Sequence, residues 1–282
     1  MSNWTLDDIP WDAFDASRAD PDMVCIIKAA ALTERNSAHY SRYLCNVFRD
    51  DEGFCAQAET WAGEEEQHGD TLARWATLAD PSFDFEETFQ RFREGYVIPT
   101  DVDASVRGSR SGEMVARCIV EVGTSSFYSA LRDATDEPVL KEICHRIAGD
   151  EFRHYKLFYD TLKRTQGEDR LSRRDRLMVA VKRMQESEDD ELAFAYHCAN
   201  TPDQPYDRET SSRAYGARAF RHYRRGHIDR ASGMVMKAAG LRPHGWMGRL
   251  FGGALWRYLR FRLWRLRDEG PRAADDKAGA AA

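Results

Sequence analysis

The chain has 282 residues, 42% hydrophobic and 31% charged, a composition typical of a folded globular protein and not of a disordered or fibrous one. The net charge of −6 conceals an asymmetry, because residues 208–267 carry 15 Lys/Arg against only 2 Asp/Glu and the rest is strongly acidic. The amino terminus lacks a signal-peptide pattern, no apolar run approaches about 20 residues, and the six cysteines are scattered, so we expect a cytoplasmic protein with free thiols and no transmembrane helix.

Apolar residues recur with a helical period, so we predict an all-α fold. Asp20-Pro21-Asp22 is a typical helix start, with proline near the first helical position. Four main helices and one short helix are expected at residues 21–49, 53–79, 85–96, 112–133 and 139–165. The second and third main helices are joined by a long connection, which predicts a four-helix bundle with one crossover.

Further helices are expected in the carboxy-terminal part, at residues 171–186, 189–200, 209–226, 228–240 and 246–267. The linker 201–205 contains two prolines. We therefore divide the chain into a bundle domain (1–200), a basic, arginine-rich helical segment (201–269) and a disordered tail (270–282) rich in alanine and aspartate.

Six side chains form a repeated pattern, in which a single glutamate is followed about thirty residues later by Glu-x-x-His: Glu34, Glu65 and His68, then Glu121, Glu151 and His154. A third match, Glu142 and His145, lies nine residues before Glu151. At 100° per residue it occupies the opposite, charged side of the same helix. We interpret it as a surface pair.

The spacing of the single glutamates supports a shared site. Ligands on two antiparallel helices lie at the same height only if the turn falls midway between them. The midpoint of Glu34 and Glu65 falls in the polar run 49–53, and the midpoint of Glu121 and Glu151 falls in Ala134-Thr135-Asp136-Glu137-Pro138, a turn signal. The chain therefore reads as a duplicated helical hairpin.

Two single glutamates and two Glu-x-x-His pairs on four helices are the ligands of carboxylate-bridged di-iron or di-manganese bundles. Buried carboxylates need compensating cations, and this oxygen-rich set favours iron, or manganese with iron, over structural zinc. We expect Glu65 and Glu151 to bridge two ions, with Glu34/His68 and Glu121/His154 completing one ion each. Asp150 and Glu64 precede the bridging glutamates, and either orient the ligand histidines through the second ring nitrogen or lie on the helix surface.

The motifs carry a family resemblance. Residues 61–70, with Glu-Glu-x-x-His-Gly-Asp, residues 142–154, ending in Asp-Glu-x-Arg-His, and Glu121-x-x-Thr124 resemble the soluble acyl-[acyl-carrier-protein] desaturases over about residues 25–165. Gln67 stands where that family has arginine. The resemblance implies a ferritin-like fold, two iron ions, dioxygen as co-substrate, an external electron-donor protein and hydrogen abstraction from an unactivated C–H. It also implies that Thr124 lies beside the oxygen-binding position, whereas the alternative is a hydroxyl bonded to a helix carbonyl.

The leading hypothesis is an oxygen-activating di-iron oxidoreductase, desaturase or hydroxylase in type, for an acyl or other lipophilic substrate that is free or carrier-bound. Small residues near the site either leave room for such a chain or allow close helix packing: Ala30, Ala31, Ala38, Gly123, Ser125 and Ser126. The main alternative is a ferritin-like iron-oxidising or peroxide-scavenging protein. A tRNA-hydroxylase-like enzyme and a non-catalytic helical scaffold are lesser ones.

The arginine-rich helix 246–267 has four interpretations. It lies on an anionic membrane as a peripheral anchor, docks an acidic carrier protein, binds nucleic acid, or packs against the bundle with its arginines in water. The sequence leaves a homodimer open.

Overall fold

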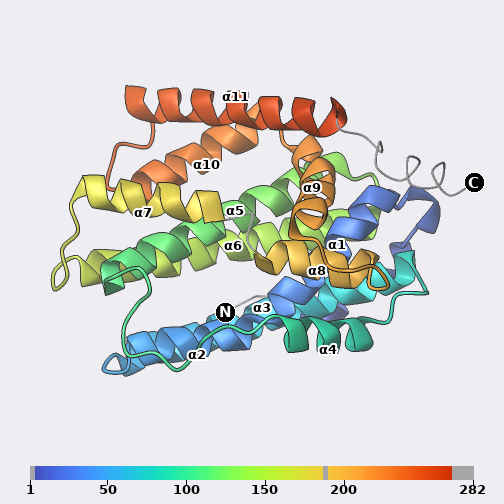
Figure 1. The fold of residues 1–282 in the computed structure, drawn as a ribbon, viewed down its shortest axis with the longest axis horizontal. Helices are drawn as coiled ribbons and strands as arrows, with labels where there is room; N and C mark the ends of the chain where they lie inside the picture. Colours follow the sequence, from blue (N-terminus) through green and yellow to red (C-terminus); the bar gives the residue numbers. More distant parts are fainter. Residues whose placement is uncertain (1–3, 187–189, 269–282) are drawn as a thin grey trace, which may run out of the picture.

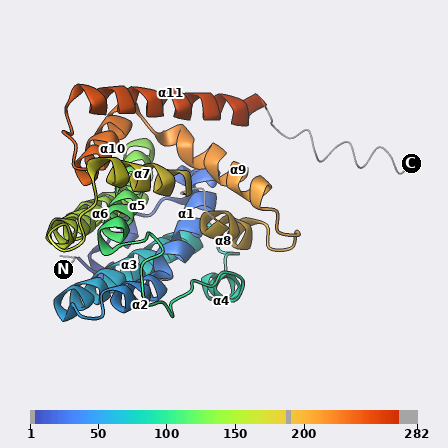
Figure 2. The same ribbon diagram turned by 60° about the vertical axis from the view of Figure 1, so that its left-hand side comes forward.

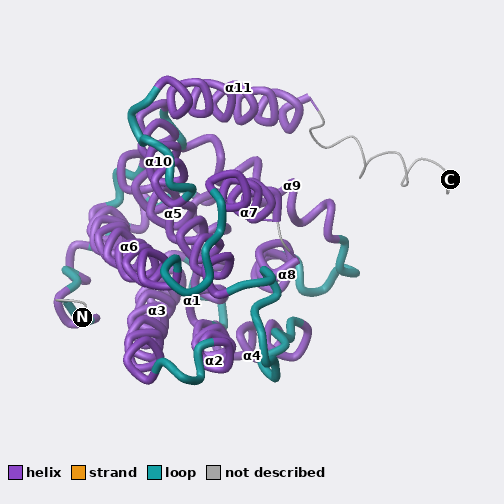
Figure 3. Tube along the Cα trace, turned by 90° about the vertical axis from the view of Figure 1, so that its left-hand side faces the viewer, coloured by secondary structure: helices purple, strands orange, loops and turns teal. Residues whose placement is uncertain are grey.

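The computed structural model describes residues 4–186 and 190–268, so the tail expected to be disordered at 270–282 lies outside the described residues. Within them all regular structure is helical, as predicted, and the helices form one bundle with further helices stacked on it (Figure 1; Figure 3). None of the described helices is long and apolar enough to cross a membrane.

The bundle helices follow the predicted boundaries within a few residues, with one exception at the first. They are α1 (Pro21–Arg35), α2 (Ser37–Val47), α3 (Glu52–Ala79), α5 (Arg110–Ala134) and α6 (Pro138–Thr165), with the short α4 (Phe85–Gly95) in the crossover. The predicted turns are confirmed, because α2 gives way to α3 between residues 47 and 52, and α5 to α6 between residues 134 and 138.

Side-chain caps fix where these helices start. Asp20, Asp51 and Ser109 each accept a hydrogen bond from a backbone N–H in the first turn of α1, α3 and α5. Glu137 accepts from two such groups at the start of α6, where Pro138 occupies the first helical position. Each cap satisfies amide groups that the helix itself leaves unpaired.

The prediction of one continuous helix over 21–49 is wrong, because the helix breaks at Asn36. The backbone of α3 comes so close there that a Cβ on Gly69 would lie 2.6 Å from the Arg35 nitrogen. The Ser37 hydroxyl donates to the Ala62 carbonyl of α3 at 2.9 Å. Both contacts join residues that are far apart in the sequence. Ala38, which was expected near the site, lies beyond the break and is exposed.

The helices pack in pairs. α5 packs along α6, α1 and α2 pack on α3, and α3 contacts α6. Two apolar clusters fill the interior: one holds Leu72 and Phe127, the other Trp61 and Ile119. The ligand positions 65, 68 and 121 fall between these residues along α3 and α5, so the predicted site lies where the two clusters meet.

The carboxy-terminal helices pack around the bundle, and the last two of them lie above it in Figure 1. These carboxy-terminal helices are α7 (Arg173–Gln185), α8 (Asp190–Asn200), α9 (Arg208–Ala219), α10 (Arg225–Ala238) and α11 (Trp246–Asp268). α7 and α10 pack on α5, α8 on α1, α9 on α8 and α11 on α10. The prediction of a helix over 209–226 is wrong at its end, because α9 stops at Ala219 and the short 3-10 turn η5 (Phe220–His222) leads into α10.

Candidate metal centre

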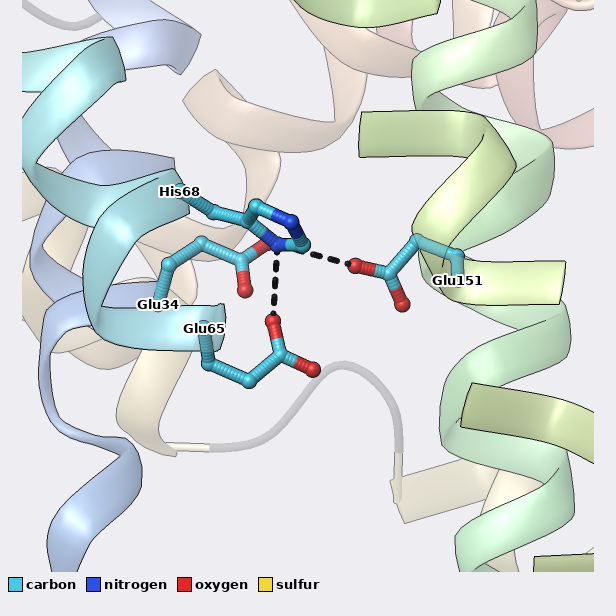
Figure 4. Close-up of side chains that lie close together, drawn as sticks. All are labelled: Glu34, Glu65, His68 and Glu151. Carbon is cyan, nitrogen blue, oxygen red and sulfur yellow. Dashed lines mark hydrogen bonds and ion pairs between the residues drawn. The ribbon is translucent and has the colours of Figure 1, made fainter. Parts of the chain in front are cut away.

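The structure brings the six predicted ligand side chains together in the interior of the bundle. Glu34 comes from the last turn of α1, Glu65 and His68 from the middle of α3, Glu121 from α5, and Glu151 and His154 from α6. The spacing of three within each Glu-x-x-His pair places both side chains on one face of the helix. Figure 4 shows Glu34, Glu65 and His68 meeting Glu151 from the opposite helix.

The six side chains form two overlapping groups of candidate ligands. One group is Glu34, Glu65, His68 and Glu151, and the other replaces Glu34 and His68 with Glu121 and His154. Within each group one ligand atom per residue lies within 4.8 Å of every other. Glu65 and Glu151 belong to both groups, which is the arrangement that two ions bridged by these carboxylates would need.

The two histidines present the same ring nitrogen to the centre. His68 Nδ1 lies 3.0 Å from Glu65 Oε2 and 3.5 Å from Glu151 Oε1. His154 Nδ1 lies 3.1 Å from Glu65 Oε1 and 3.8 Å from Glu121 Oε2. The ring centroids are 5.8 Å apart, so one compact site serves both.

The outer ring nitrogens contact the carboxylates that precede Glu65 and Glu151 in the sequence. His68 Nε2 lies 3.0 Å from Asp150 Oδ2, and His154 Nε2 lies 2.8 Å from Glu64 Oε2. Each histidine of one Glu-x-x-His helix is thus oriented by a carboxylate of the other. Arg153 contacts both Asp150 and Glu64. Such outer partners fix the tautomer and direction of a ligand histidine.

Burial and the close approach of several carboxylates shift the pKa values of the candidate ligands. Burial, and then the charges of Glu65 and Glu151, hold the pKa of Glu34 well above its usual value. Burial and the same two carboxylates raise the pKa of Glu121 as well. Burial opposes the charged form of His154, but Glu65 and Glu64 outweigh it and raise its pKa to about 9. Without cations, therefore, the site retains protons.

Three buried carboxylate oxygens of the cluster lack a hydrogen-bond partner in the described part of the chain: Glu121 Oε1 and Oε2 and Glu151 Oε1. Glu121 and Glu151 are 1% and 0% exposed. Buried polar atoms are almost always paired, and an unpaired buried carboxylate is costly. A pair of divalent cations would satisfy these atoms, so the residues fit the metal centre that the sequence predicts.

Thr124 lies beside the cluster. Its hydroxyl donates to Glu151 Oε2 at 2.5 Å, and it is also within 3.3–3.4 Å of the Glu121 and Val120 carbonyls. The contact with helix carbonyls, one of the two alternatives, is therefore present together with a hydrogen bond to a candidate metal ligand, and the position beside bound oxygen stays a prediction. A side chain that contacts Glu151 and also lines the adjacent cavity is well placed to act on what binds there.

Two residues of the site were not predicted. The Tyr128 hydroxyl donates to Glu34 Oε1 at 2.5 Å. The ring of Trp4 stacks on His68 at 5.9 Å, and its Nε1 donates to Asp150 Oδ2 at 2.9 Å. Tyr128 lies seven residues after Glu121 on the same helix face, which was a usable signal. Trp4 lies outside any helical pattern and gave none.

Glu142 and His145 stay away from the centre, as predicted. Glu142 pairs with Arg146 at 2.6 Å, and His145 is exposed.

A cavity of about 220 Å³ reaches the cluster from the side of the carboxy-terminal helices. Glu34 itself lines the cavity, as do Thr124 and Tyr128, which donate hydrogen bonds to Glu151 and Glu34 of the cluster. Most of its other lining is apolar or aromatic: Ala30, Ile119, Val120, Gly123, Phe127, Leu192, Ala193, Tyr215, Gly216, Ala219, Phe220 and Tyr223. The guanidinium-bearing residues Arg183 and Arg262 also line it. Of the small residues considered for this role, Ala30 and Gly123 line the cavity.

Comparison with known proteins identifies a family. A family model described as "Fatty acid desaturase" matches residues 14–188, which include all six candidate ligands and well over half of the chain. A search of curated proteins returned no match.

Proposed function

The chain belongs to the fatty acid desaturase family and is a desaturase-type oxidoreductase, and from that premise we propose that it acts on the acyl chain of a lipophilic substrate at a di-iron centre. The observation that carries this proposal is the apolar cavity that ends at Glu34, Thr124 and Tyr128. An enzyme that oxidises an unactivated C–H needs an apolar pocket beside its metal, because the substrate offers no polar group to hold at the reacting carbon.

Glu34, Glu65, His68, Glu121, Glu151 and His154 would hold the two ions, with Glu65 and Glu151 shared between them. When bound, two iron ions would supply the activation of dioxygen and the oxidising power for C–H cleavage. In the overall reaction dioxygen takes four electrons and four protons and leaves as two water molecules. Two electrons and two protons come from the substrate, which gains a double bond, and the rest come from an external electron-donor protein and water.

The protein's own residues have three tasks in this reaction. Asp150 and Glu64 hold the histidine rings in place through Nε2. Trp4 and Trp61 lie against the rings of His68 and His154 and keep bulk water from the far side of the centre. The Thr124 hydroxyl donates a proton toward Glu151 Oε2 and, from the cavity wall, can hold or relay a proton next to the reacting carbon.

The main alternative is an iron-oxidising or peroxide-scavenging protein, which would use the same ligands without an organic substrate. The cavity favours the desaturase, because such a protein needs a path for small polar molecules and no apolar chamber. Whether the acyl group is free or carrier-bound belongs to the same proposal, and the test below includes both forms.

The test is anaerobic loading with Fe(II), followed by oxygen, a chemical or protein reductant and a series of acyl thioesters and free fatty acids. We expect two iron ions per chain and a product that has lost two hydrogens, identified by mass spectrometry. Oxygen consumption that depends on iron alone, with every acyl substrate unchanged, would favour the alternative. A product that has gained one oxygen would identify a hydroxylase.

A further inference from the structure

The helix α11 is long, basic and two-faced. It spans 23 residues, about 34 Å, and lies along the outside of the molecule (Figure 1; Figure 2). It packs on α10, α9 and η5. Leu259 is buried at 8% exposure, and Leu255 and Leu263, which lie on the same side, are half-buried. One face therefore anchors the helix to the protein.

The opposite face exposes large apolar side chains to solvent. Trp246, Leu250, Phe261 and Trp264 are between 53% and 67% exposed. At 100° per residue, all the exposed large apolar residues of the helix, which also include Met247 and Tyr258, fall within an arc of about 120°. Scattered exposed apolar residues are ordinary, but a continuous strip of this kind marks an interaction surface.

The charges around this strip have a single sign. Residues 246–267 contain six arginines and no Asp or Glu. Arg249 and Arg260 lie along one edge of the strip, and Arg257 and Arg265 lie within it, all exposed. Among the described residues, Arg249 and Arg257 form no ion pair, unlike Arg213 and Arg225, which pair with acids of their own helices.

We infer that α11 docks the protein on an anionic lipid surface. A helix with tryptophan, phenylalanine and leucine on one face and arginines beside them lies in the plane of a membrane interface, with the rings at the acyl boundary and the guanidinium groups at the phosphates. Anionic headgroups complement the arginines, and the apolar interior accepts the strip. A polyanion such as RNA would engage the arginines and stack bases on the exposed rings, but it would leave Leu250 and Met247 in water.

This inference is independent of the metal centre. Arg262 connects the helix to the substrate cavity. It lies on another side of α11, lines the cavity and stacks over the Phe220 ring at 5.4 Å. The same helix thus contacts the inferred lipid surface with one side and the substrate cavity with another. On the proposed function, a lipophilic substrate would enter near the bilayer.

The test is flotation of the full-length protein with vesicles of phosphatidylcholine alone or with about one third phosphatidylglycerol. We expect binding to the anionic vesicles, at least tenfold weaker binding to the neutral ones, and loss of binding between about 0.1 M and 1 M salt. Trp246 and Trp264 should lie in the membrane, so brominated lipids should quench tryptophan fluorescence.

Two double variants test the two parts of the surface. Phe261→Ser with Trp264→Ser should weaken binding at least tenfold, and Arg249→Gln with Arg257→Gln about 25-fold, roughly fivefold for each arginine. The matched controls remove exposed apolar or arginine side chains elsewhere, in Val97→Ser with Met178→Ser and in Arg213→Gln with Arg225→Gln. Circular dichroism and the melting temperature verify that every variant is folded.

Four results would overturn the inference. They are equal affinity for neutral and anionic vesicles, no binding to either, equal losses in the control variants, and a dimer in solution that the Phe261/Trp264 variant abolishes. The last result would assign the strip to a second copy of the chain. Salt-sensitive capture of RNA or of an acidic carrier protein, with no vesicle binding, would assign α11 to that partner instead.

Discussion

Replacing Tyr128 with phenylalanine removes one hydroxyl and almost no volume from the interior. That hydroxyl donates to Glu34 Oε1 at 2.5 Å, and Tyr128 is 1% exposed. Glu34 belongs to only one of the two ligand groups. The substitution should therefore weaken the binding of the metal ion that Glu34 and His68 would hold, and leave unchanged the affinity for the ion that Glu121 and His154 would hold.

The magnitude follows from what such outer hydrogen bonds contribute. Loss of a partner that orients a metal ligand weakens metal affinity about 10–100-fold, or about 1.4–2.7 kcal/mol. We expect anaerobic titration with Fe(II) or Co(II) to give two classes of site in the variant, one at wild-type affinity and one weaker by this factor. The metal-free variant should lose only about 0.5–3 kcal/mol of unfolding free energy, as expected for one hydrogen bond to a carboxyl group.

Tyr43→Phe is the matched control. Tyr43 is also buried, at 5% exposure, and its hydroxyl donates to a carboxylate, Glu113 Oε2, at 2.9 Å, outside the metal cluster. This variant should lose about 1.5–3 kcal/mol of stability and bind both ions normally. Our reasoning about Glu34 fails if Tyr128→Phe retains full affinity for both ions, or if Tyr43→Phe weakens metal binding equally.

Three further expectations follow from other contacts. Gly69→Ala should lower the free energy of unfolding in urea by about 1–3 kcal/mol, because the new Cβ would collide with the backbone of α1. A Cβ on Gly63 would have nothing within 4 Å, so Gly63→Ala should be neutral or stabilising by up to about 1 kcal/mol. Equal effects of the two substitutions would contradict the close approach. The side-chain hydrogen bond from Lys28 lowers the pKa of Asp80 to about 2, below its unfolded value near 3.8, so this pair stabilises the fold above about pH 4 and the contribution is lost as the pH falls toward 2. Because Asp80 is partly exposed, Asp80→Asn should lower the free energy of unfolding by only about 1 kcal/mol at neutral pH. In urea unfolding, the difference in stability between wild type and variant should shrink below pH 4. A difference that grows as the pH falls would contradict the pairing. Thr124→Val should lower turnover about tenfold or more with both ions still bound, and Thr124→Ser should restore it; metal loss in the valine variant would instead indicate a structural role.

The bundle could be predicted from the sequence because local patterns determine where its helices begin and end and which residues face inward. The two Glu-x-x-His pairs, and turns midway between the paired ligands, placed four helices and six side chains at a common height. Capping by Asp51, Ser109 and Glu137 reinforced those boundaries with purely local signals.

What the sequence did not reveal depends on contacts between distant segments. The break at Asn36 coincides with the approach of α3 at Gly69, and its local signal, asparagine followed by serine, is masked because Ser37–Val47 continues with helical periodicity. The shortening of α9 at Ala219 likewise arises where η5 packs near α5 and α11. The roles of Asp150 and Glu64 remained ambiguous for the same reason. Each carboxylate contacts the histidine of the other helix, and this contact depends on how α3 and α6 pack, which the sequence of one helix does not show.

Trp4 links the start of the chain to the centre of the molecule. Its indole donates to Asp150, 146 positions later, and its carbonyl accepts from Gln67 Nε2 at 3.1 Å. Trp4 can take this position only when α3 and α6 are packed together, because its hydrogen-bond partners lie on these two helices. A purification tag fused ahead of Trp4 would disturb this packing, so metal-loaded preparations tagged at opposite ends should differ in how fast a chelator removes the metal.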